Sequence, residues 1–172
     1  MRRFILCSTL LMAACNGNQA QLEEFSSPTG AFTIATPVPL EATQESVQTP
    51  VGPIEIHTFQ AETEDSAYVV AYSDYPAAIV TESDPEMLLN SSRDGAISNV
   101  GGTLVSEEAI EIDGNPGRSL VISTGEGTAE PAVINSRIYL VDNRLYQILV
   151  VTPEGAEQPA VTDGFLESFD LN

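Results

Sequence analysis

Few side chains in this sequence could carry out catalysis. His57 is the only histidine, which excludes a metal site built on two histidines. His57 could act as the base of a Ser-His-Asp set, but the sequence has no G-x-S-x-G motif to present a nucleophilic serine. We therefore predict no catalytic residues, no metal and no cofactor, and we keep a hydrolase that uses His57 as an alternative.

Carboxylates are far more numerous than any other chemically active group. The chain has 25 Asp and Glu against 6 basic residues, and its net charge is -19. This charge repels phosphate backbones and anionic lipid surfaces, so we predict a protein that binds no nucleic acid. Glu62, Glu64 and Asp65 form an oxygen-rich group without EF-hand spacing, so a calcium or small-ligand carrier is a second alternative. We expect a monomer.

Three arginines lie in segments that are expected to be neighbouring strands. Arg118, Arg137 and Arg144 could together form an anion-binding or partner-binding site. In so acidic a chain, each could instead pair with a nearby carboxylate and act only within the fold. The sequence leaves both interpretations open.

The N-terminus carries a targeting signal. Arg2 and Arg3 precede an apolar run that is too short to cross a hydrocarbon core of ~30 Å, which takes about 20 helical residues. The run ends in LMAAC, which resembles the bacterial lipobox with its cysteine at Cys15. The resemblance implies that residues 1-14 are a signal peptide, that Cys15 receives a diacylglyceryl group and that its new amine is acylated. Two or three acyl chains anchor a protein stably.

Lipidation of Cys15 would leave no thiol for other chemistry. Cys7 lies within the signal, so the mature chain could form neither a disulfide nor a thiolate metal site. We expect residues 15-24 to be a flexible tether and residues 25-172 to be a single domain. The protein would face the periplasm, and Asn16 after the cysteine favours the outer membrane; thylakoid or cell-surface anchoring are the alternatives.

Alternating and apolar segments predict a mostly β domain with two helices. A capping box from Ser83 to Glu86 starts a helix that ends near Gly101 and buries Met87, Leu88 and Leu89. Residues 43-53 should form a loop, and Gly117 should have a positive φ in a turn. Strands are expected at residues 30-36, 54-60, 67-75, 103-112, 118-124, 132-141 and 144-151, with a closing helix at 157-168.

A hairpin around Asp142 and Asn143 indicates how the sheet is buried. A two-residue turn there places Tyr139 opposite Tyr146 and Leu140 opposite Leu145. Both faces of the hairpin are then apolar, so both faces of the sheet must be covered. We predict an α+β fold, a three-layer α/β/α sandwich around an antiparallel β-sheet.

The order of elements and three motifs resemble the PsbP-like superfamily. The motifs are NPGRSL (115-120), RIYLVDNRLYQILVVTP (137-153) and FLESFDL (165-171). Members include the PsbP proteins of photosystem II, a Ran-binding nuclear import factor and DcrB-type envelope lipoproteins. The resemblance implies an α/β/α sandwich and a non-enzymatic accessory role. We therefore expect a lipid-anchored accessory protein that binds or assists a membrane-associated complex.

Overall fold

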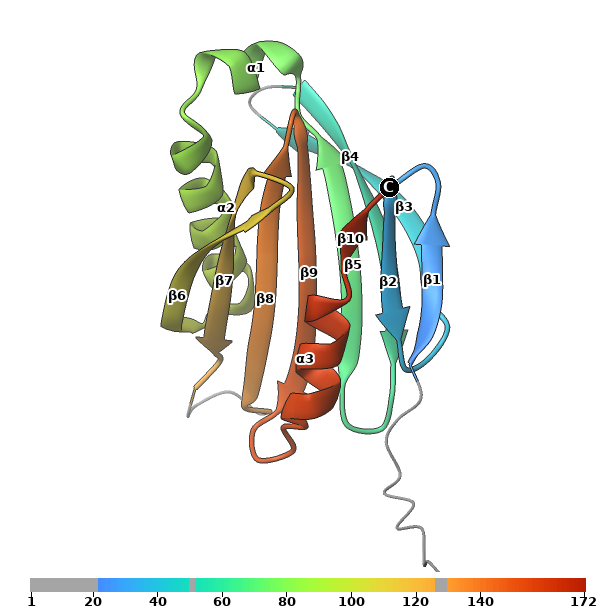
Figure 1. The fold of residues 1–172 in the computed structure, drawn as a ribbon. Helices are drawn as coiled ribbons and strands as arrows, with labels where there is room; N and C mark the ends of the chain where they lie inside the picture. The colour runs from blue at the N-terminus through green and yellow to red at the C-terminus, as the bar shows by residue number, and fades with distance from the viewer. Residues whose placement is uncertain (1–21, 50–51, 126–129) are drawn as a thin grey trace, which may run out of the picture.

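The computed structural model describes residues 22-49, 52-125 and 130-172 (Figure 1). The predicted signal peptide, Cys15 and most of the predicted tether lie outside these residues. The first strand begins at Glu23, so the last two residues predicted as tether belong to the folded domain. Within the described residues, no helix is both long enough and apolar enough to span a bilayer.

Seven strands form one antiparallel sheet, which is the centre of the fold. The order across the sheet is β3-β4-β5-β9-β8-β7-β6, so β3 and β6 are its two edges. The paired strands of this sheet are consecutive in the sequence, except that β5 pairs with β9. This pairing brings the two halves of the chain together at the middle of the sheet. The strands are β3 (Glu41–Thr49), β4 (Gly52–Glu62), β5 (Ala67–Asp74), β6 (Thr103–Ile112), β7 (Asn115–Ser123), β8 (Ala132–Val141) and β9 (Arg144–Pro153).

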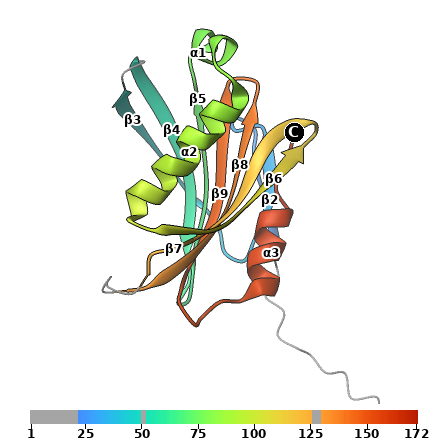
Figure 2. The same cartoon turned by 90° about the vertical axis from the view of Figure 1, so that its left-hand side faces the viewer.

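In the part of the chain that the structure describes, three helices and a second, smaller sheet complete the fold. The small sheet joins β1, β2 and β10, and so pairs the two ends of the described chain. It lies with α3 on one side of the large sheet (Figure 1), whereas α2 runs obliquely across the other side (Figure 2). The elements are β1 (Glu23–Ser27), β2 (Phe32–Thr36), α1 (Ala77–Glu82), α2 (Pro85–Val100), α3 (Pro159–Glu167) and β10 (Asp170–Leu171).

Each face of the large sheet has its own core, as the apolar hairpin predicted. On the α3 side, Tyr146, Ile148 and Val150 of β9 pack with residues of β2 and α3, including Phe32 and Phe165. On the α2 side, the buried residues come from α2, β7, β8 and the start of β9: Leu89, Leu120, Ile122, Ile134, Ile138, Leu140 and Leu145.

The α+β class and the antiparallel sheet are confirmed. The prediction of helices as the covering layers was incomplete, because Phe32 and Ile34 of the small sheet supply part of the α3-side core. The strand that contains Phe32 and Ile34 was predicted from its alternation, but its place in a second sheet was not. Its partner β1 has five residues without alternating burial, so the sequence gives no sign of this small sheet.

The register of the predicted hairpin is confirmed. Tyr139 lies opposite Tyr146 and Leu140 opposite Leu145, and Asp142 has a φ of 53° in the turn. The predicted role of Gly117 was wrong, because positive φ occurs at Asp113 and Gly114 instead. Gly117 is required for space: a Cβ atom there would lie 2.5 Å from the Ile138 carbonyl oxygen and 2.5 Å from Cδ1 of Tyr139.

The start of α2 differs slightly from the capping-box prediction. Asp84, not Ser83, is the N-cap, and its side chain accepts a hydrogen bond from the Glu86 backbone N–H. Gly101 closes the helix in the left-handed conformation, as predicted. Leu89 is fully buried, but Met87 is 54% exposed and was wrongly placed in the core.

Strand β3 and helix α1 were missed by the sequence analysis. Residues 43-49, predicted as part of a loop, belong to β3. Residues 41-48 are all exposed, so neither face of this strand shows the alternation that burial imposes on a sequence. The strand is held by its backbone pairing to β4 along its whole length.

Candidate binding surface

Arg118 is a buried arginine that ties α2 to the sheet. It lies on β7 and is 9% exposed. Its guanidinium donates to Glu86 of α2 and lies 3.1 Å from Glu107 of β6. Arg93 of α2 reaches the same Glu107 carboxylate at 2.9 Å. Two arginines and two carboxylates therefore hold the helix against one edge of the sheet, and Arg118 is occupied within the fold.

Arg137 lies on the opposite face, beneath the end of α3. Its Nη1 donates to the Leu166 carbonyl at 3.3 Å, and Nη2 lies 3.7 Å from the Glu167 carboxylate. A cation at the C-terminus of a helix offsets the negative end of the helix dipole. Arg137 therefore anchors α3 on the sheet.

Arg144 lies at the start of β9, next to the β8-β9 turn. Its Nε and Nη2 atoms donate to both carboxylate oxygens of Asp74, at 2.6 and 2.8 Å, and Nη1 donates to the Thr29 carbonyl at 3.1 Å. The hydrogen bonds from Arg144 hold the pKa of Asp74 below its usual value. This fork-to-fork geometry is the strongest arginine-carboxylate arrangement.

Arg144 also ends a stack of rings. Its guanidinium carbon lies 4.4 Å from the centroid of the Tyr72 ring, and His57 stacks on Tyr72 at 4.5 Å between centroids with planes 9° apart. Next to this stack, the Tyr146 hydroxyl donates to the Gly30 carbonyl at 2.7 Å, and burial raises the pKa of Tyr146. The hydrogen bonds from Arg144 and Tyr146 to the carbonyls of Thr29 and Gly30 hold the β1-β2 connection on the sheet.

The three arginines named by sequence are therefore not brought together. Arg118 faces α2, whereas Arg137 and Arg144 face α3 and the small sheet from different strands. Each makes an ion pair with a carboxylate, as the local-pairing interpretation describes. Their ion pairs serve the fold at three separate places, although Nε of Arg137 is buried without a hydrogen-bond partner.

His57 shows no catalytic partner among the described residues. Among the described residues its ring stacks on Tyr72, and its electrostatic interaction with Asp74 contributes to the lowered pKa of that carboxyl. The His57 ring forms no hydrogen bond there to a hydroxyl or carboxylate. The acidic group at Glu62, Glu64 and Asp65 is exposed. In the described part of the chain, no three His, Cys, Asp or Glu side chains are grouped to hold a metal ion.

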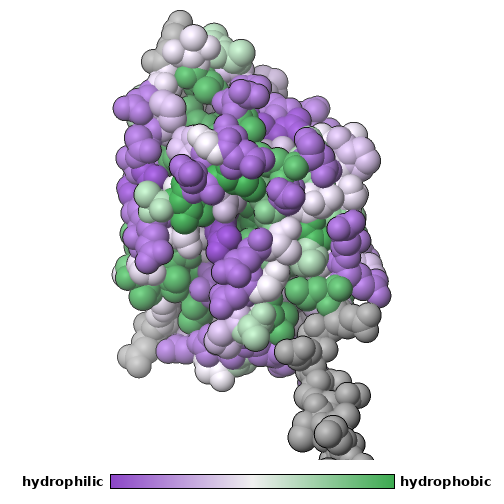
Figure 3. Space-filling model, in the orientation of Figure 1, coloured by the Kyte–Doolittle hydropathy of each residue, from purple (hydrophilic) through white to green (hydrophobic). Residues whose placement is uncertain are grey.

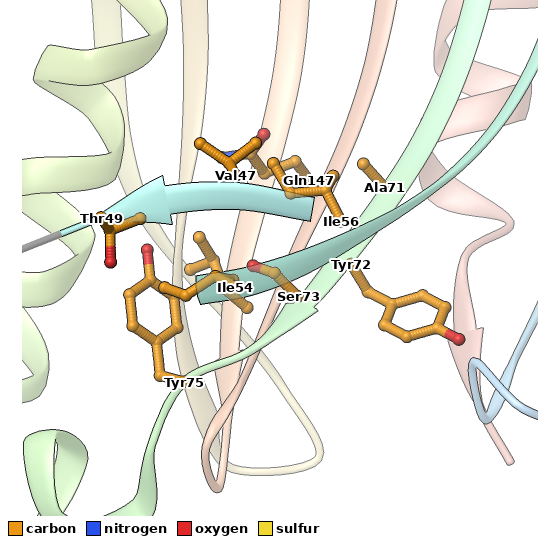
Figure 4. A pocket seen from close by; sticks show the side chains of 10 residues that line it. Val47, Thr49, Ile54, Ile56, Ala71, Tyr72, Ser73, Tyr75 and Gln147 are labelled. Atoms are coloured by element: carbon orange, nitrogen blue, oxygen red, sulfur yellow. The ribbon is translucent and has the colours of Figure 1, made fainter. Parts of the chain in front are cut away.

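A concave apolar region lies on the α2 side of the sheet, beyond the helix. A cavity of about 150 Å³ opens there between β3, β4, β5 and the start of β9. In Figure 4, Ile54, Ile56 and Val47 line it, and the Tyr75 ring stands near Thr49. Tyr72, at the rim, points to the opposite face of the sheet (Figure 4).

Register explains why these side chains share a face. Val47 pairs with Ile54, and Ile56 pairs with Ser73, so residues two apart on each strand all point to the α2 side. Ile54 is buried, but Ile56 is only half-buried and Val47 is 38% exposed. The floor of the cavity is apolar and accessible.

Tyr75 forms one wall and is held firmly. Its backbone N–H donates to the Asn143 carbonyl at 2.8 Å, and its own carbonyl accepts from the Asn143 side chain at 2.9 Å. Burial raises the pKa of the Tyr75 hydroxyl, which keeps it neutral. Tyr75 thus presents an aromatic ring with a polar tip from a backbone position that Asn143 holds, and its ring packs against the α2-side core.

A second cavity of about 170 Å³ continues along the flank of α2. It is lined by β8 and β9 together with Ala96, Asn99 and Val100 of the helix. Gln147 lines both cavities and donates to the Ser92 hydroxyl of α2 at 3.0 Å. We call the α2-facing residues of the first cavity the open half of the α2-side face. They are Val47, Thr49, Ile54, Ile56, Ala71, Ser73, Tyr75, Leu145 and, at the boundary, Gln147.

The other side of the molecule is different in character. Viewed from the α3 side, hydrophobic and hydrophilic side chains are interspersed in small groups (Figure 3). The aromatic residues of that side are packed inside, with Phe32 and Phe165 fully buried. We therefore take the open half, an accessible apolar cavity, as the candidate binding surface.

Sequence reasoning missed this surface. In the sequence, Ile54, Ile56 and Tyr75 are indistinguishable from buried core residues of strands. Strand β3, which carries Val47, was not predicted. One signal was available. Strand β5 is apolar on both faces, so both of its faces need to be covered, but a single helix of 16 residues cannot cover a sheet of seven strands.

The sequence matches no protein-family model, and it matches no curated protein sequence. Its fold does match a solved structure. The chain is similar to the solution structure of cyanobacterial PsbP (CyanoP) from Synechocystis sp. PCC 6803, with a TM-score of 0.59. The match covers 94% of this chain and 99% of that chain at 15% sequence identity. The fold is therefore PsbP-like, as the sequence motifs predicted.

Proposed function

We propose that this protein is a non-catalytic accessory module, exported and anchored by lipid at Cys15, that binds a protein of a membrane-associated complex. The observation that carries the proposal is the open half of the α2-side face. An apolar floor formed by Ile54 and Ile56, with the aromatic wall of Tyr75, is the kind of concave patch at which proteins bind partners.

Charge supports a partner with a basic surface. All four arginines of the described chain pair with carboxylates inside the fold, so most of the acidic residues are left without a cation. A basic partner would be attracted to this surface and would associate faster at low salt.

The PsbP-like fold supports a binding role, since the resemblance implies accessory functions. The apolar run before Cys15 motivates export and anchoring.

The anchor is tested by mass spectrometry of the native mature protein. We expect a chain that begins at Cys15 and carries the added mass of a diacylglyceryl group and an N-acyl chain. Recovery of a chain with residues 1-14 still attached and no lipid would refute the anchor.

The binding surface is tested by affinity purification from detergent-solubilised membranes. The variant with Val47→Asp and Ile56→Asp should lose proteins that the wild type retains, because two carboxylates would enter the apolar floor. Val105→Asp is the matched control, since Val105 is 63% exposed on β6 at the other edge of the sheet. Equal recovery with all three proteins would refute the assignment of the surface.

The hydrolase alternative has its own test. His57→Ala should leave every measured hydrolytic activity of the native protein unchanged under our proposal. A loss of activity in this variant, with the fold intact by circular dichroism, would favour the hydrolase.

A further inference from the structure

Strand β3 is an edge of the large sheet, and it lacks the features that block strand addition at the other edge. Its pairing with β4 runs from Glu41 opposite Gln60 to Thr49 opposite Gly52 without a register shift. In the described chain, β4 is its only strand partner. Residues 41-48 are exposed, and the strand contains no Pro and no Lys. The outer backbone N–H and C=O groups of residues 41-48 are therefore available to pair with another strand.

The opposite edge, β6, is protected. Its pairing with β7 shifts register between Leu104 and Ser106, and such a bulge twists an edge away from new partners. Glu107 of β6 is also tied by salt bridges to Arg93 and Arg118. The two edges of one sheet thus differ in the devices that prevent strand addition, and β3 lacks those seen at β6.

The side chains of β3 specify what kind of strand would fit. Glu41, Glu45 and Val47 lie on the same face of the strand, because they are separated by even numbers of residues. Val47 lines the cavity, and Glu45 lies opposite Ile56, which also lines it. The same face of β3 therefore carries two carboxylates, Glu41 and Glu45, followed by Val47 at the apolar cavity.

We propose that β3 accepts an extended segment of the partner protein, which adds an eighth, antiparallel strand to the sheet; this rests on the proposed binding function. The segment carries Lys or Arg opposite Glu41 and Glu45, and an apolar side chain beside Val47 that reaches the cavity. Antiparallel addition continues the pattern of every existing pairing in the sheet. In the direction of the partner chain, the pattern is apolar-x-basic-x-x-x-basic.

A second copy of this chain does not fit the same edge. The β3 strand has two Glu and no basic residue, so self-pairing brings four carboxylates together without a cation. Like charges across paired strands are destabilising, and each copy carries a net charge of -19. A basic partner segment would pair a cation with Glu41 and Glu45, which a second copy of β3 cannot do.

The probe is a synthetic peptide, acetyl-Thr-Val-Thr-Lys-Thr-Thr-Thr-Lys-Thr-amide, titrated into the folded domain and followed by amide NMR signals. We expect the signals of β3 residues to shift, and we expect the Kd to rise with salt because the carboxylates are exposed. The Glu41→Lys/Glu45→Lys variant should weaken binding about tenfold or more, since two opposite-charge pairs become like-charge pairs.

Two controls separate charge from fold. Glu108→Lys/Glu111→Lys changes the net charge equally on exposed residues of the β6 edge and should leave the peptide affinity within about twofold. A peptide with Glu in place of both Lys should bind the Glu41→Lys/Glu45→Lys variant and not the wild type, which also shows that the variant is folded.

No shift at β3 with the wild type, or equal weakening by both double variants, would overturn the proposal. If the peptide fails while the membrane purification still depends on Val47 and Ile56, strand addition is wrong and the proposed function stands. If both fail, the binding surface itself is wrong.

Discussion

The two faces of the large sheet are covered to different extents. On the α3 side, α3 and the small sheet enclose an aromatic cluster in which Phe32 and Phe165 are completely buried. On the α2 side, the helix packs on β7 and β8, and the cavity with its half-buried Ile56 lies open beyond it. Both faces therefore contain a buried core, but only the α2-side face leaves an apolar cavity open beyond its helix.

The boundary between the closed and open parts has a definite structure. Gln147 of β9 bonds to Ser92 of α2, and the two cavities meet at this residue. On one side of it lie Leu89 and Ile138, which are buried; on the other lies Val47, which is exposed. The following predictions test this difference, from the largest effect to the smallest.

Phe32→Ala should have the largest effect on stability. It removes a fully buried ring from the α3-side core and leaves a cavity, so the free energy of unfolding should fall by about 3–5 kcal/mol. Ile56→Ala in the open half should cost only roughly 1 kcal/mol, because the side chain is half-exposed. Urea denaturation measures both, and equal losses would show that the two faces do not differ in packing.

Gly117→Ala should be destabilising through overpacking. The added methyl would overlap the Ile138 carbonyl and the Tyr139 ring at the closed face, at a cost of about 1–3 kcal/mol. Gly95→Ala is the control, since nothing lies within 4 Å of its Cβ position on α2. Thermal unfolding should show a lower Tm for the first variant and an unchanged or higher Tm for the second.

Gln147→Ala should loosen the boundary. It leaves the Ser92 hydroxyl without this partner and should cost about 1 kcal/mol of unfolding free energy. Hydrogen exchange should increase in the middle of α2 and remain unchanged in β2 on the other face. Faster exchange in both places would indicate a global loss of stability instead of a local one.

Asp74→Asn should have the smallest effect and a defined pH dependence. The folded-state pKa of Asp74 is lowered by Arg144, so its contribution to stability is present above the unfolded pKa of about 3.9 and is lost as pH falls through the lower folded value. Because the pair is partly exposed, we expect a loss of about 0.2–1 kcal/mol at neutral pH. Below the folded pKa, the stabilities of the wild type and the variant should converge in acid titrations of urea unfolding.

Most of the architecture could be predicted because burial leaves a periodic pattern. The β8-β9 hairpin was placed in its correct register since its turn residues fix the pairing and both of its faces are apolar. Likewise, Gly101 marked the end of α2 through its left-handed conformation. Edge strands such as β3 were not predicted, because exposed residues need not alternate between apolar and polar. The sequence around each arginine also does not show whether arginines of different strands lie close together.

The candidate surface was the least predictable part. Ile54 and Ile56 have the same alternation as core residues, and only the position of α2 decides which apolar side chains stay uncovered. Arg118, Arg137 and Arg144 were correctly placed on β-strands, but the direction that each side chain takes depends on strand parity in the assembled sheet.

The central claim, that the open half of the α2-side face binds a protein partner, is tested most directly by site-specific photocrosslinking in the cells that produce the protein. A photoreactive amino acid replaces Ile56 in one strain and the exposed Val105 of β6 in another. We predict a discrete crosslinked protein from position 56 and none from position 105. No adduct at position 56, or the same adduct from both positions, would contradict the account.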